Sequence, residues 1–159
     1  MAEISDLPLW ERVFMKAYPY RQARWSRAAP VVPPAKARVA LITTAAVHLP
    51  DQPPFDESIR GGDFTYRWVP GDVDVQSLVI SHRSRSFDRA GLLKDRNLGF
   101  PLDRFRELVA ERIVGSLNER HLSFMGSITA PGRLLRDAAP QATEALRKDG
   151  VNLALLVPV

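Results

Sequence analysis

The stretch "ARVALITTAAVHL", residues 37–49, decides how the chain is expected to fold. Its centre, residues 39–43, is a continuous run of aliphatic and β-branched residues that does not alternate between polar and apolar. Such a run is typical of a strand buried on both faces, as in a parallel sheet. We therefore predict a sheet in which this strand is an interior member.

The segments after residue 100 predict the other layers of the fold. Pro101 suits the first turn of a helix, Gly115 suits its end, and Pro140 predicts a break in a second helix. The expected helix, strand, helix and strand lie at 101–115, 121–128, 131–150 and 151–159, and the apolar run after Gly150 predicts that the last strand is buried. With right-handed crossovers, this order predicts an α/β fold. We expect an open, Rossmann-like three-layer sheet that is largely parallel in the C-terminal half.

The segments before residue 100 add shorter elements. Residues 7–17 predict a helix, and "AAPVVPPAKA" (28–37) predicts an extended connector, because proline lacks a backbone donor and restricts its predecessor. The chain is thus expected to divide into 1–37, a helix with a proline-rich connector, and 38–159, an α/β domain incomplete at its C-terminus. Inside that domain we expect a loop, a half-buried strand, a short strand and a polar loop, at 49–62, 63–72, 77–82 and 83–100.

Composition excludes several classes of protein. The chain has 159 residues, 45% hydrophobic and 25% charged, which suits one globular domain. The net charge is +4, but the 22 basic residues are scattered, so we expect no nucleic-acid partner. No apolar stretch approaches the roughly 20 residues that span a bilayer, and the N-terminus lacks a signal-peptide pattern, so we expect no membrane and a cytoplasmic location. There is no cysteine, hence no disulfide and no thiol nucleophile.

The three histidines are the candidate catalytic residues. His48 and His82 each follow a predicted strand, and ligands of open α/β sheets bind beyond the carboxyl ends of the strands. Histidine also titrates near neutral pH, which suits a general acid or base. His121 lies at the start of its strand, where this argument does not apply. A hydrogen-bonded structural histidine is the simpler interpretation of each one, and no spacing predicts a metal site.

Four smaller residues are candidates for substrate binding. The turns "TTAAVH" (43–48) and "MGSITAPG" (125–132) contain Thr44 and Gly126, and small residues let a backbone approach an anion. Neither turn matches a nucleotide-binding pattern. Asp63 is a candidate carboxylate, although an aspartate after glycines more often caps a turn. Ser81 adjoins His82 but is not in a nucleophile-elbow motif.

Six stretches, taken in order, resemble the selenoprotein B family. This family contains the substrate-specific subunits of glycine, sarcosine and betaine reductases and the small selenoprotein subunit of D-proline reductase. The stretches are "VALITTAAVHL", "GDFTYRWVPGD", "VISH", "NLGFPLDRFRELVAERIVGSL", "HLSFMG" and "KDGVNLALLVPV". The resemblance groups all three histidines, because family members place a histidine at the positions of His48 and His121 and a Ser-His at those of Ser81 and His82.

The resemblance implies a reaction and its partners. The family reductively cleaves a carbon–nitrogen bond in glycine, sarcosine, betaine or D-proline, with a dithiol or a thioredoxin-type protein as electron donor. A partner subunit carries a pyruvoyl group that binds or activates the substrate amine. A selenolate or thiolate attacks, since a polarisable nucleophile of low pKa is ionised at neutral pH. His48 and His82 are then expected to flank it and to donate protons to the leaving amine.

The redox residue of the family begins a Sec/Cys-x-x-Cys motif directly after the strand that matches "LALLVPV". It would therefore follow Val159, the last residue of the sequence. We expect an in-frame UGA codon for selenocysteine at that point; a fragment, a frameshift or a degenerate paralogue are the alternatives. Whether this chain is itself an enzyme stays open. A non-catalytic α/β scaffold subunit, or an unrelated hydrolase or isomerase that uses the histidines, would explain the sequence otherwise.

Overall fold

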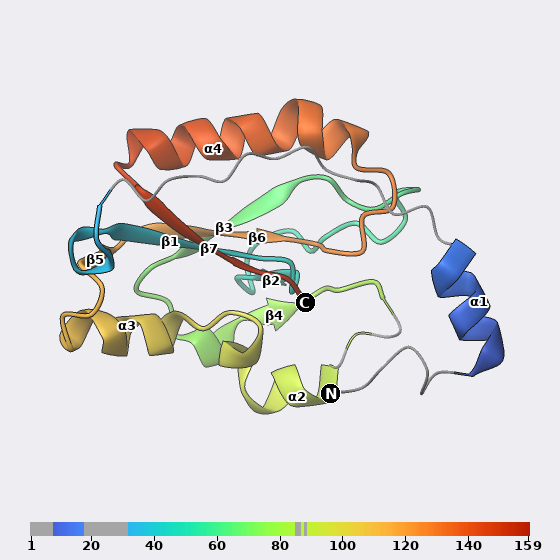
Figure 1. Cartoon of the computed structure of the whole chain (residues 1–159), viewed down its shortest axis with the longest axis horizontal. Helices are drawn as coiled ribbons and strands as arrows, with labels where there is room; N and C mark the ends of the chain where they lie inside the picture. The colour runs from blue at the N-terminus through green and yellow to red at the C-terminus, as the bar shows by residue number, and fades with distance from the viewer. Residues whose placement is uncertain (1–7, 18–31, 85–86, 88) are drawn as a thin grey trace.

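A computed structural model describes residues 8–17, 32–84, 87 and 89–159 (Figure 1). The helices are α1 (Leu9–Ala17), α2 (Arg89–Lys94), α3 (Leu102–Ala110) and α4 (Ala139–Lys148), and a π-helical turn, Leu134–Ala138, leads into α4. The strands are β1 (Arg38–Thr43), β2 (Val47–His48), β3 (Tyr66–Pro70), β4 (Val79–Ile80), β5 (Ser116–Leu117), β6 (Arg120–Phe124) and β7 (Leu153–Val157). Residues 28–31 of the predicted connector lie outside the described ranges, and so do residues 1–7, which bear on a signal peptide. In the described part of the connector, Pro34–Lys36 form a 3₁₀ turn, so the prediction of an extended connector is corrected there.

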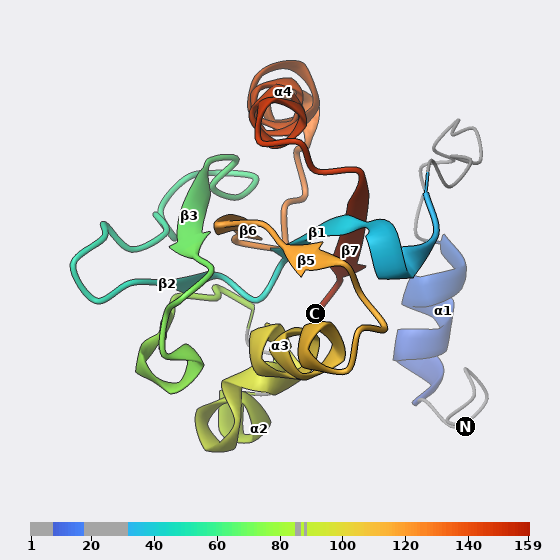
Figure 2. The same ribbon diagram turned by 90° about the vertical axis from the view of Figure 1, so that its left-hand side faces the viewer.

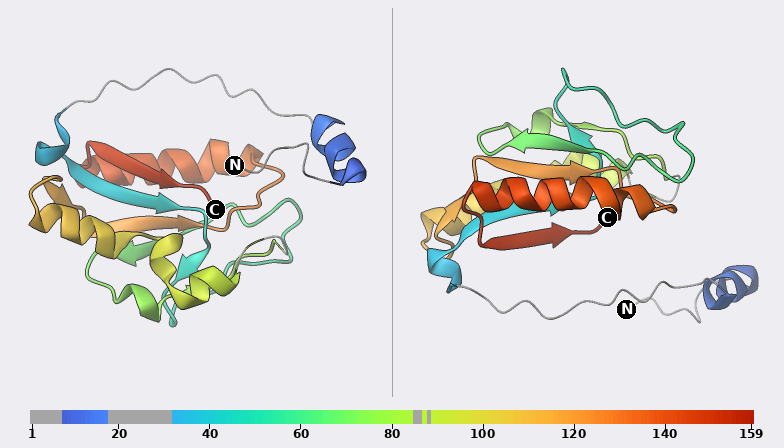
Figure 3. Two further views of the ribbon diagram at one scale, coloured as in Figure 1. Left: turned by 60° about the horizontal axis from the view of Figure 1, so that its bottom comes forward. Right: turned by 90° about the horizontal axis from the view of Figure 1, so that it is seen from above.

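Strand β1 is the centre of the main sheet. It pairs in parallel with β7 along 39–43, and on its other edge with β5 and then β6. Figure 3 shows β1 and β7 side by side. The first three residues of the run, Val39, Ala40 and Leu41, are fully buried. The prediction of an interior strand in a parallel sheet is confirmed.

The N-terminal half contributes the antiparallel part. β3 pairs antiparallel with β6, with Val69 opposite His121. β2 and β4 form a separate two-stranded antiparallel sheet, in which His48 lies opposite Val79. These pairings bring the segments that follow β1 and β4 together at one end of the molecule.

Helices cover both faces of the main sheet, so the fold has the three layers expected (Figures 1 and 2). α4 covers one face, where Ala142 and Leu146 pack on Ala40 and Leu122. α2 and α3 cover the other face, over a larger core that includes Leu41. The α/β architecture with a mostly parallel sheet agrees with the prediction.

Two helix boundaries differ from the expectation. α3 ends at Ala110 and not at Gly115, because the N–H groups of Ile113 and Val114 turn back to Leu108 and Arg112 adopts a φ of 61°. Gly115 instead permits a close approach of chains, since a Cβ there would lie 2.7 Å from the Ala37 carbonyl oxygen. The break expected near Pro140 is the π-helical turn that precedes it.

Two other expectations are corrected. The polar segment 83–100 was predicted to be loop, but it contains α2, whose Leu92 is buried in the core. The last apolar run was predicted to be a buried strand, and β7 has Leu156 66% exposed. β7 pairs only with β1 among the described strands, so its outer edge and part of its surface face solvent.

The core position Leu41 gives a direct test of this packing. Leu41→Ala removes a fully buried side chain and is expected to lower the free energy of unfolding by about 2–5 kcal/mol. Urea denaturation of the two proteins measures the difference. Leu98→Ala, at a side chain 65% exposed, is the matched control and should change it by about 0.5 kcal/mol or less. Equal effects of the two substitutions would contradict the buried position of β1.

Candidate functional site

The carboxyl ends of β1, β6 and β7 lie at the same edge of the sheet. Thr44 follows β1, Gly126 follows β6, and Val159 lies two residues beyond β7. The N–H of Val159 donates to Thr44 Oγ1 at 2.9 Å, and Thr44 Oγ1 lies 3.3 Å from the Val159 carbonyl oxygen. Parallel strands thus direct these three residues to one place, which is where α/β sheets bind ligands.

Gly126 permits a close approach at the centre of this edge. Its φ is 65°, a region that favours glycine. A Cβ there would lie 2.5 Å from the carbonyl oxygen of Thr44 and 2.8 Å from Nε2 of His82. Only a residue without a side chain therefore lets β6 turn while it contacts both neighbours.

His82 has one nitrogen engaged and one without a partner. Its side chain is 3% exposed and stacks on Phe87 with 4.0 Å between ring centroids. Nδ1 accepts the backbone N–H of Ser84 at 3.2 Å, so in the neutral ring the proton is on Nε2. Nε2 is buried and has no hydrogen-bond partner within the described residues. A buried donor without an acceptor is costly and marks a candidate functional group.

The charge state of His82 follows from its surroundings. Burial lowers the pKa of the imidazole, and the positive charge of Arg89 lowers it further, against a smaller raising effect of Glu57. The Arg89 guanidinium also donates to the backbone carbonyl of His82. His82 is therefore neutral at neutral pH and presents an N–H group to the edge of the sheet.

His48 and Ser81 form a hydrogen-bonded pair beside this group. His48 Nε2 lies 2.7 Å from Ser81 Oγ, and Nδ1 lies 2.7 Å from the Leu49 carbonyl oxygen. A carbonyl only accepts, so Nδ1 carries the proton and Nε2 of the neutral ring accepts from Ser81. The backbone N–H of Ser81 donates to Ala46 at 3.0 Å, which ties the pair to the turn after β1.

Both carboxylate oxygens of Asp63, a predicted substrate-binding residue, already accept hydrogen bonds from residues near it in the sequence. Oδ1 accepts from the backbone and hydroxyl of Thr65, and Oδ2 accepts from the backbone of Asp56. Burial raises the pKa of this carboxyl, but these hydrogen bonds and Arg67 outweigh it and leave the pKa below its usual value. The carboxylate shapes the loop before β3, as the turn-capping interpretation predicted. Its backbone N–H meets Met125 Sδ at 3.3 Å, next to Gly126.

His121 does not join the other histidines. It lies in β6 with no exposed surface, against the edge of Phe100, and its Nδ1 accepts the backbone N–H of Leu41 at 3.1 Å. Burial, with a smaller effect of Arg106, lowers its pKa to about 4. Its Nε2, like that of His82, is buried without a hydrogen-bond partner among the described residues, but it lies within β6 and not at the carboxyl edge of the sheet. The catalytic role expected of His121 remains a prediction.

The structure thus brings together Thr44, Gly126, His82 and Val159, with the Ser81–His48 pair adjoining them. Sequence reasoning missed Phe87, which orients His82, because it lies in a polar segment without periodicity. No group of three or more His, Cys, Asp or Glu in the described part of the chain could hold a metal ion. Within that part, no helix is long and apolar enough to cross a membrane.

Comparison with known proteins identifies relatives of this chain. It is 32% identical over 118 residues to D-proline reductase subunit gamma of Acetoanaerobium sticklandii, and the match covers 74% of this chain and 47% of that subunit. It is 27% identical over 121 residues to sarcosine reductase complex component B subunit beta of Peptoclostridium acidaminophilum, covering 76% and 28%. The chain is homologous to these reductase subunits. The resemblance that the sequence indicated is confirmed.

The comparisons also set the extent of the relationship. The chain spans about half the length of the D-proline reductase subunit, at 47%, and less of the sarcosine reductase subunit. No family model matches the chain, and no solved structure matches it. The relationship therefore rests on these aligned stretches, which cover about three quarters of the chain.

The buried state of His121 predicts how stability depends on pH. An unfolded histidine has a pKa of about 6.5, and in the fold His121 has about 4, so the unfolded state binds the proton first. The contribution of His121 to the free energy of unfolding is complete above pH ~6.5. It is lost as the pH falls toward ~4, by at most ~1.4 kcal/mol per pH unit. His121→Gln keeps an acceptor for Leu41 and should flatten this slope. Urea denaturation between those pH values measures it; an unchanged slope would show that His121 is not the titrating group.

Proposed function

We propose that this chain is part of a selenocysteine- or cysteine-dependent reductase that cleaves a C–N bond in glycine, sarcosine, betaine or D-proline. The proposal is supported by the homology to subunits of D-proline and sarcosine reductases. It is supported as well by the site, whose residues lie at the ligand-binding edge of an α/β sheet. The electron donor would be a dithiol or a thioredoxin-type protein.

One observation carries the proposal. The backbone of Val159 is hydrogen-bonded to Thr44, and the Thr44 carbonyl and His82 Nε2 both lie against Gly126. A residue joined to Val159 would therefore begin beside the one buried donor of the described site that has no partner. This is the position at which the resemblance expects the selenocysteine or cysteine.

The residues present fit such a group. His82 offers an N–H donor in a position that is 3% exposed, and Gly126, which has no side chain, lets the Thr44 carbonyl and this donor come together where a Cβ would clash with both. The selenium or sulfur and a second thiol would supply two electrons, ending as a selenenylsulfide or disulfide while the C–N bond is replaced by C–H and N–H bonds. His82 Nε2–H would hold the anionic form of the nucleophile, since a hydrogen bond to a charged group lowers its pKa.

The Ser81–His48 pair would donate a proton to the leaving amine. When His48 is protonated, its Nε2–H donates to Ser81 Oγ, and the hydroxyl proton is released toward the departing nitrogen. Leu49 holds the other ring nitrogen and fixes the orientation of the ring. The same Ser81 oxygen can accept a hydrogen bond from a substrate ammonium group before reaction.

Activation of the substrate would depend on a partner subunit. The relatives are named as subunits, which supports a multi-subunit assembly. We propose that one partner carries a pyruvoyl group that binds or activates the substrate amine. The cytoplasm is the proposed location, because the reaction needs a supply of reduced dithiols.

The genomic sequence tests the position of the redox residue. We expect a UGA codon directly after the Val159 codon, followed by an open frame that begins x-x-Cys. Sequencing of this region in the source genome decides it. A UAA or UAG codon, or a frame without a cysteine at the third codon after the UGA, would exclude the proposed motif while leaving the homology intact.

Variants of the protein read through that codon, with cysteine in the redox position, test the site. His82→Ala should lower kcat/KM for the substrate about 100-fold, by loss of a donor to the anion. It should also raise the thiol pKa, measured as the pH dependence of alkylation by iodoacetamide. Partial recovery of both values in His82→Gln would distinguish a donor role from a structural one.

Matched variants complete this test. His48→Ala should lower kcat with an unchanged thiol pKa, because His48 acts on the leaving amine. Glu107→Gln, at an exposed ion pair on α3, is the control for substitution itself. Full turnover of both histidine variants would remove these residues from the mechanism.

A second function is favoured by the Ser81–His48 geometry. A hydroxyl held 2.7 Å from an imidazole that is itself oriented by a carbonyl is the arrangement of an activated nucleophile, as in hydrolases. Activity of the 159-residue chain without any dithiol would support this alternative. A scaffold role would instead leave the chain inactive in both forms.

A further inference from the structure

Phe55 lies in the loop between β2 and β3 and packs against the imidazole of His48. Both residues are almost fully buried, at 2% and 3% exposed, and the two rings meet edge to face with 6.4 Å between their centroids. Phe55 also forms a small apolar cluster with Ala46 and Met125. The carbonyl of Ala46 accepts the backbone N–H of Ser81, so this cluster supports the turn to which Ser81 is bonded.

A buried ion pair holds the peptide groups on both sides of Phe55. Before it, the Pro54 carbonyl accepts from Nη2 of Arg67 at 3.0 Å; after it, the N–H of Asp56 donates to Oδ2 of Asp63 at 3.0 Å. The two charged groups lie 3.8 Å apart, and their side chains are 15% and 3% exposed. The guanidinium also lies over the phenyl ring, 4.4 Å from its centroid. One ion pair therefore fixes both the backbone and the ring of Phe55.

The contacts of Arg67 require a guanidinium group. Nε donates to the Pro53 carbonyl at 2.8 Å, and Nη1 donates to Thr65 Oγ1 at 2.9 Å and to the Tyr66 carbonyl at 3.2 Å. A guanidinium directs five N–H groups in one plane, whereas the ammonium of lysine is a single point of charge. A lysine here could keep the charge opposite Asp63, but it could not hold two successive loop carbonyls and cover a ring.

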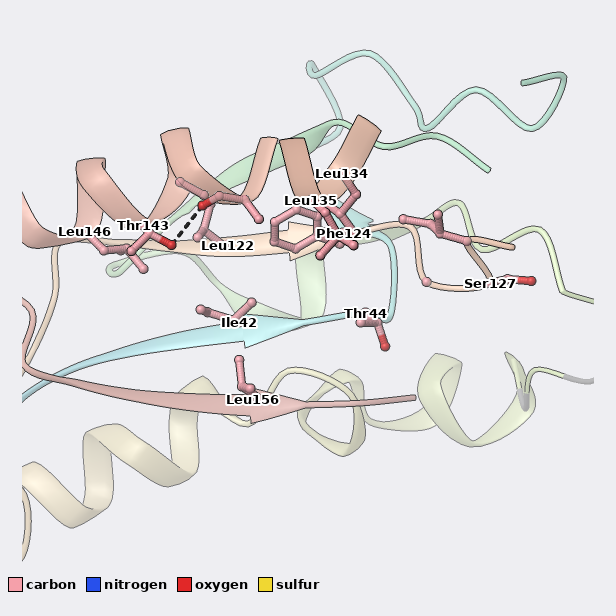
Figure 4. A pocket seen from close by; sticks show the side chains of 14 residues that line it. Ile42, Thr44, Leu122, Phe124, Ser127, Leu134, Leu135, Thr143, Leu146 and Leu156 are labelled. Carbon is pink, nitrogen blue, oxygen red and sulfur yellow. Dashed lines mark hydrogen bonds between the residues drawn. The ribbon is translucent and has the colours of Figure 1, made fainter. Parts of the chain in front are cut away.

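The cavity at the edge of the sheet does not include these residues. It has a volume of about 460 Å³ and is lined from β1, β6, β7 and α4 (Figure 4). Thr44 and Ser127 belong to its lining, whereas Phe55, Asp63 and Arg67 do not. A molecule bound in this cavity would meet Thr44 and leave the ion pair untouched. Any effect of Arg67 and Asp63 on the site is therefore exerted through the loop that they hold.

We propose that this ion pair, acting through Phe55, sets the orientation of the His48 ring. In that orientation Nδ1 meets the Leu49 carbonyl and Nε2 meets Ser81 Oγ, each at 2.7 Å. Release of the loop would let the ring turn away from Ser81. The orientation itself is a property of the fold. Its effect on turnover rests on the proposed function, in which His48 supplies the proton for the leaving amine.

The tautomer of His48 reports this orientation. Nδ1 of His48 faces a carbonyl and carries the proton, whereas Nδ1 of His82 and of His121 accepts a backbone N–H, so these two rings carry the proton on Nε2. Nitrogen-15 NMR of the ring nitrogens distinguishes the two forms at about pH 8, where an imidazole of ordinary pKa is neutral. Of the three histidines, all of which the structure describes, His48 should give the single Nδ1–H spectrum.

Two variants test the proposal in the 159-residue chain. Arg67→Lys keeps a charge opposite Asp63 and loses the planar fork, and Phe55→Leu removes the aromatic edge with a smaller change in volume than alanine. In both variants His48 should become a mixture of the two tautomers, while His121 keeps its Nε2–H form and shows that the sheet is intact. A single Nδ1–H form of His48 in both variants would overturn the proposal.

Arg106→Lys is the matched control. Arg106 also donates to two loop carbonyls, those of Gly71 and Val73, and pairs with Asp103, but it holds a different loop. This substitution should leave the His48 spectrum unchanged. An equal change of tautomer in Arg106→Lys would show a general loosening of the fold and would overturn the specific role of Arg67.

Turnover separates this inference from the proposed function. In the read-through protein with cysteine in the redox position, Arg67→Lys should lower kcat about tenfold and change KM less than about twofold, because it misplaces a proton donor without touching the substrate. An altered tautomer with unchanged kcat would overturn the positioning role. A wild-type protein without dithiol-dependent reductase activity would reject the proposed function alone, since the tautomers are measured without substrate.

Discussion

The backbone of β1 is hydrogen-bonded along both of its edges, and the rest of the structure depends on this constraint. β7 pairs with the whole strand on one edge, and β5 and β6 share the other. Because all of these pairings are parallel, the carboxyl ends of three strands reach one edge of the sheet. Thr44, Gly126 and Val159 meet there as a result of strand direction, before any side-chain chemistry is considered. His82 then enters from the small β2–β4 sheet, which is held by the turn after β1.

Much of this fold could be predicted from patterns in the sequence. An unbroken β-branched run predicted the interior strand, and the order of later elements predicted the parallel layers. The exposure of β7 could not be predicted, because an apolar run does not reveal whether a neighbour lies on both sides of it. α2 was missed for a different reason: six residues are too few to show a helical period, and burial of Leu92 depends on tertiary contacts. Gly115 shows that a glycine after a helix can serve chain packing instead of a cap.

The candidate site was predictable in part. The rule that ligands bind beyond strand ends selected His48 and His82, and both lie at that edge. It could not predict that His48 is bonded to Ser81 while His82 keeps a buried N–H without a partner, since hydrogen bonds between distant segments leave no local signal. The same limit applies to Asp63, whose oxygens are taken up by its own loop, and to His121, which completes the hydrogen bonding of β1. The sequence resemblance groups His48, His82 and His121, whereas the structure places His121 in a different environment from the other two.

The pairing of β1 with β7 also sets how the chain can fold. Arg38 and Asn152, hydrogen-bonded at the start of the two strands, are 114 residues apart in the sequence. To form this contact the chain must close a long loop, which costs conformational entropy, and contacts of this kind slow folding. During synthesis the hydrophobic β1 emerges far ahead of the strand that covers one of its edges, and in the meantime it is exposed to misassociation. β5 and β6 can cover only the other edge of β1, so the edge that β7 occupies stays unpaired until β7 is made.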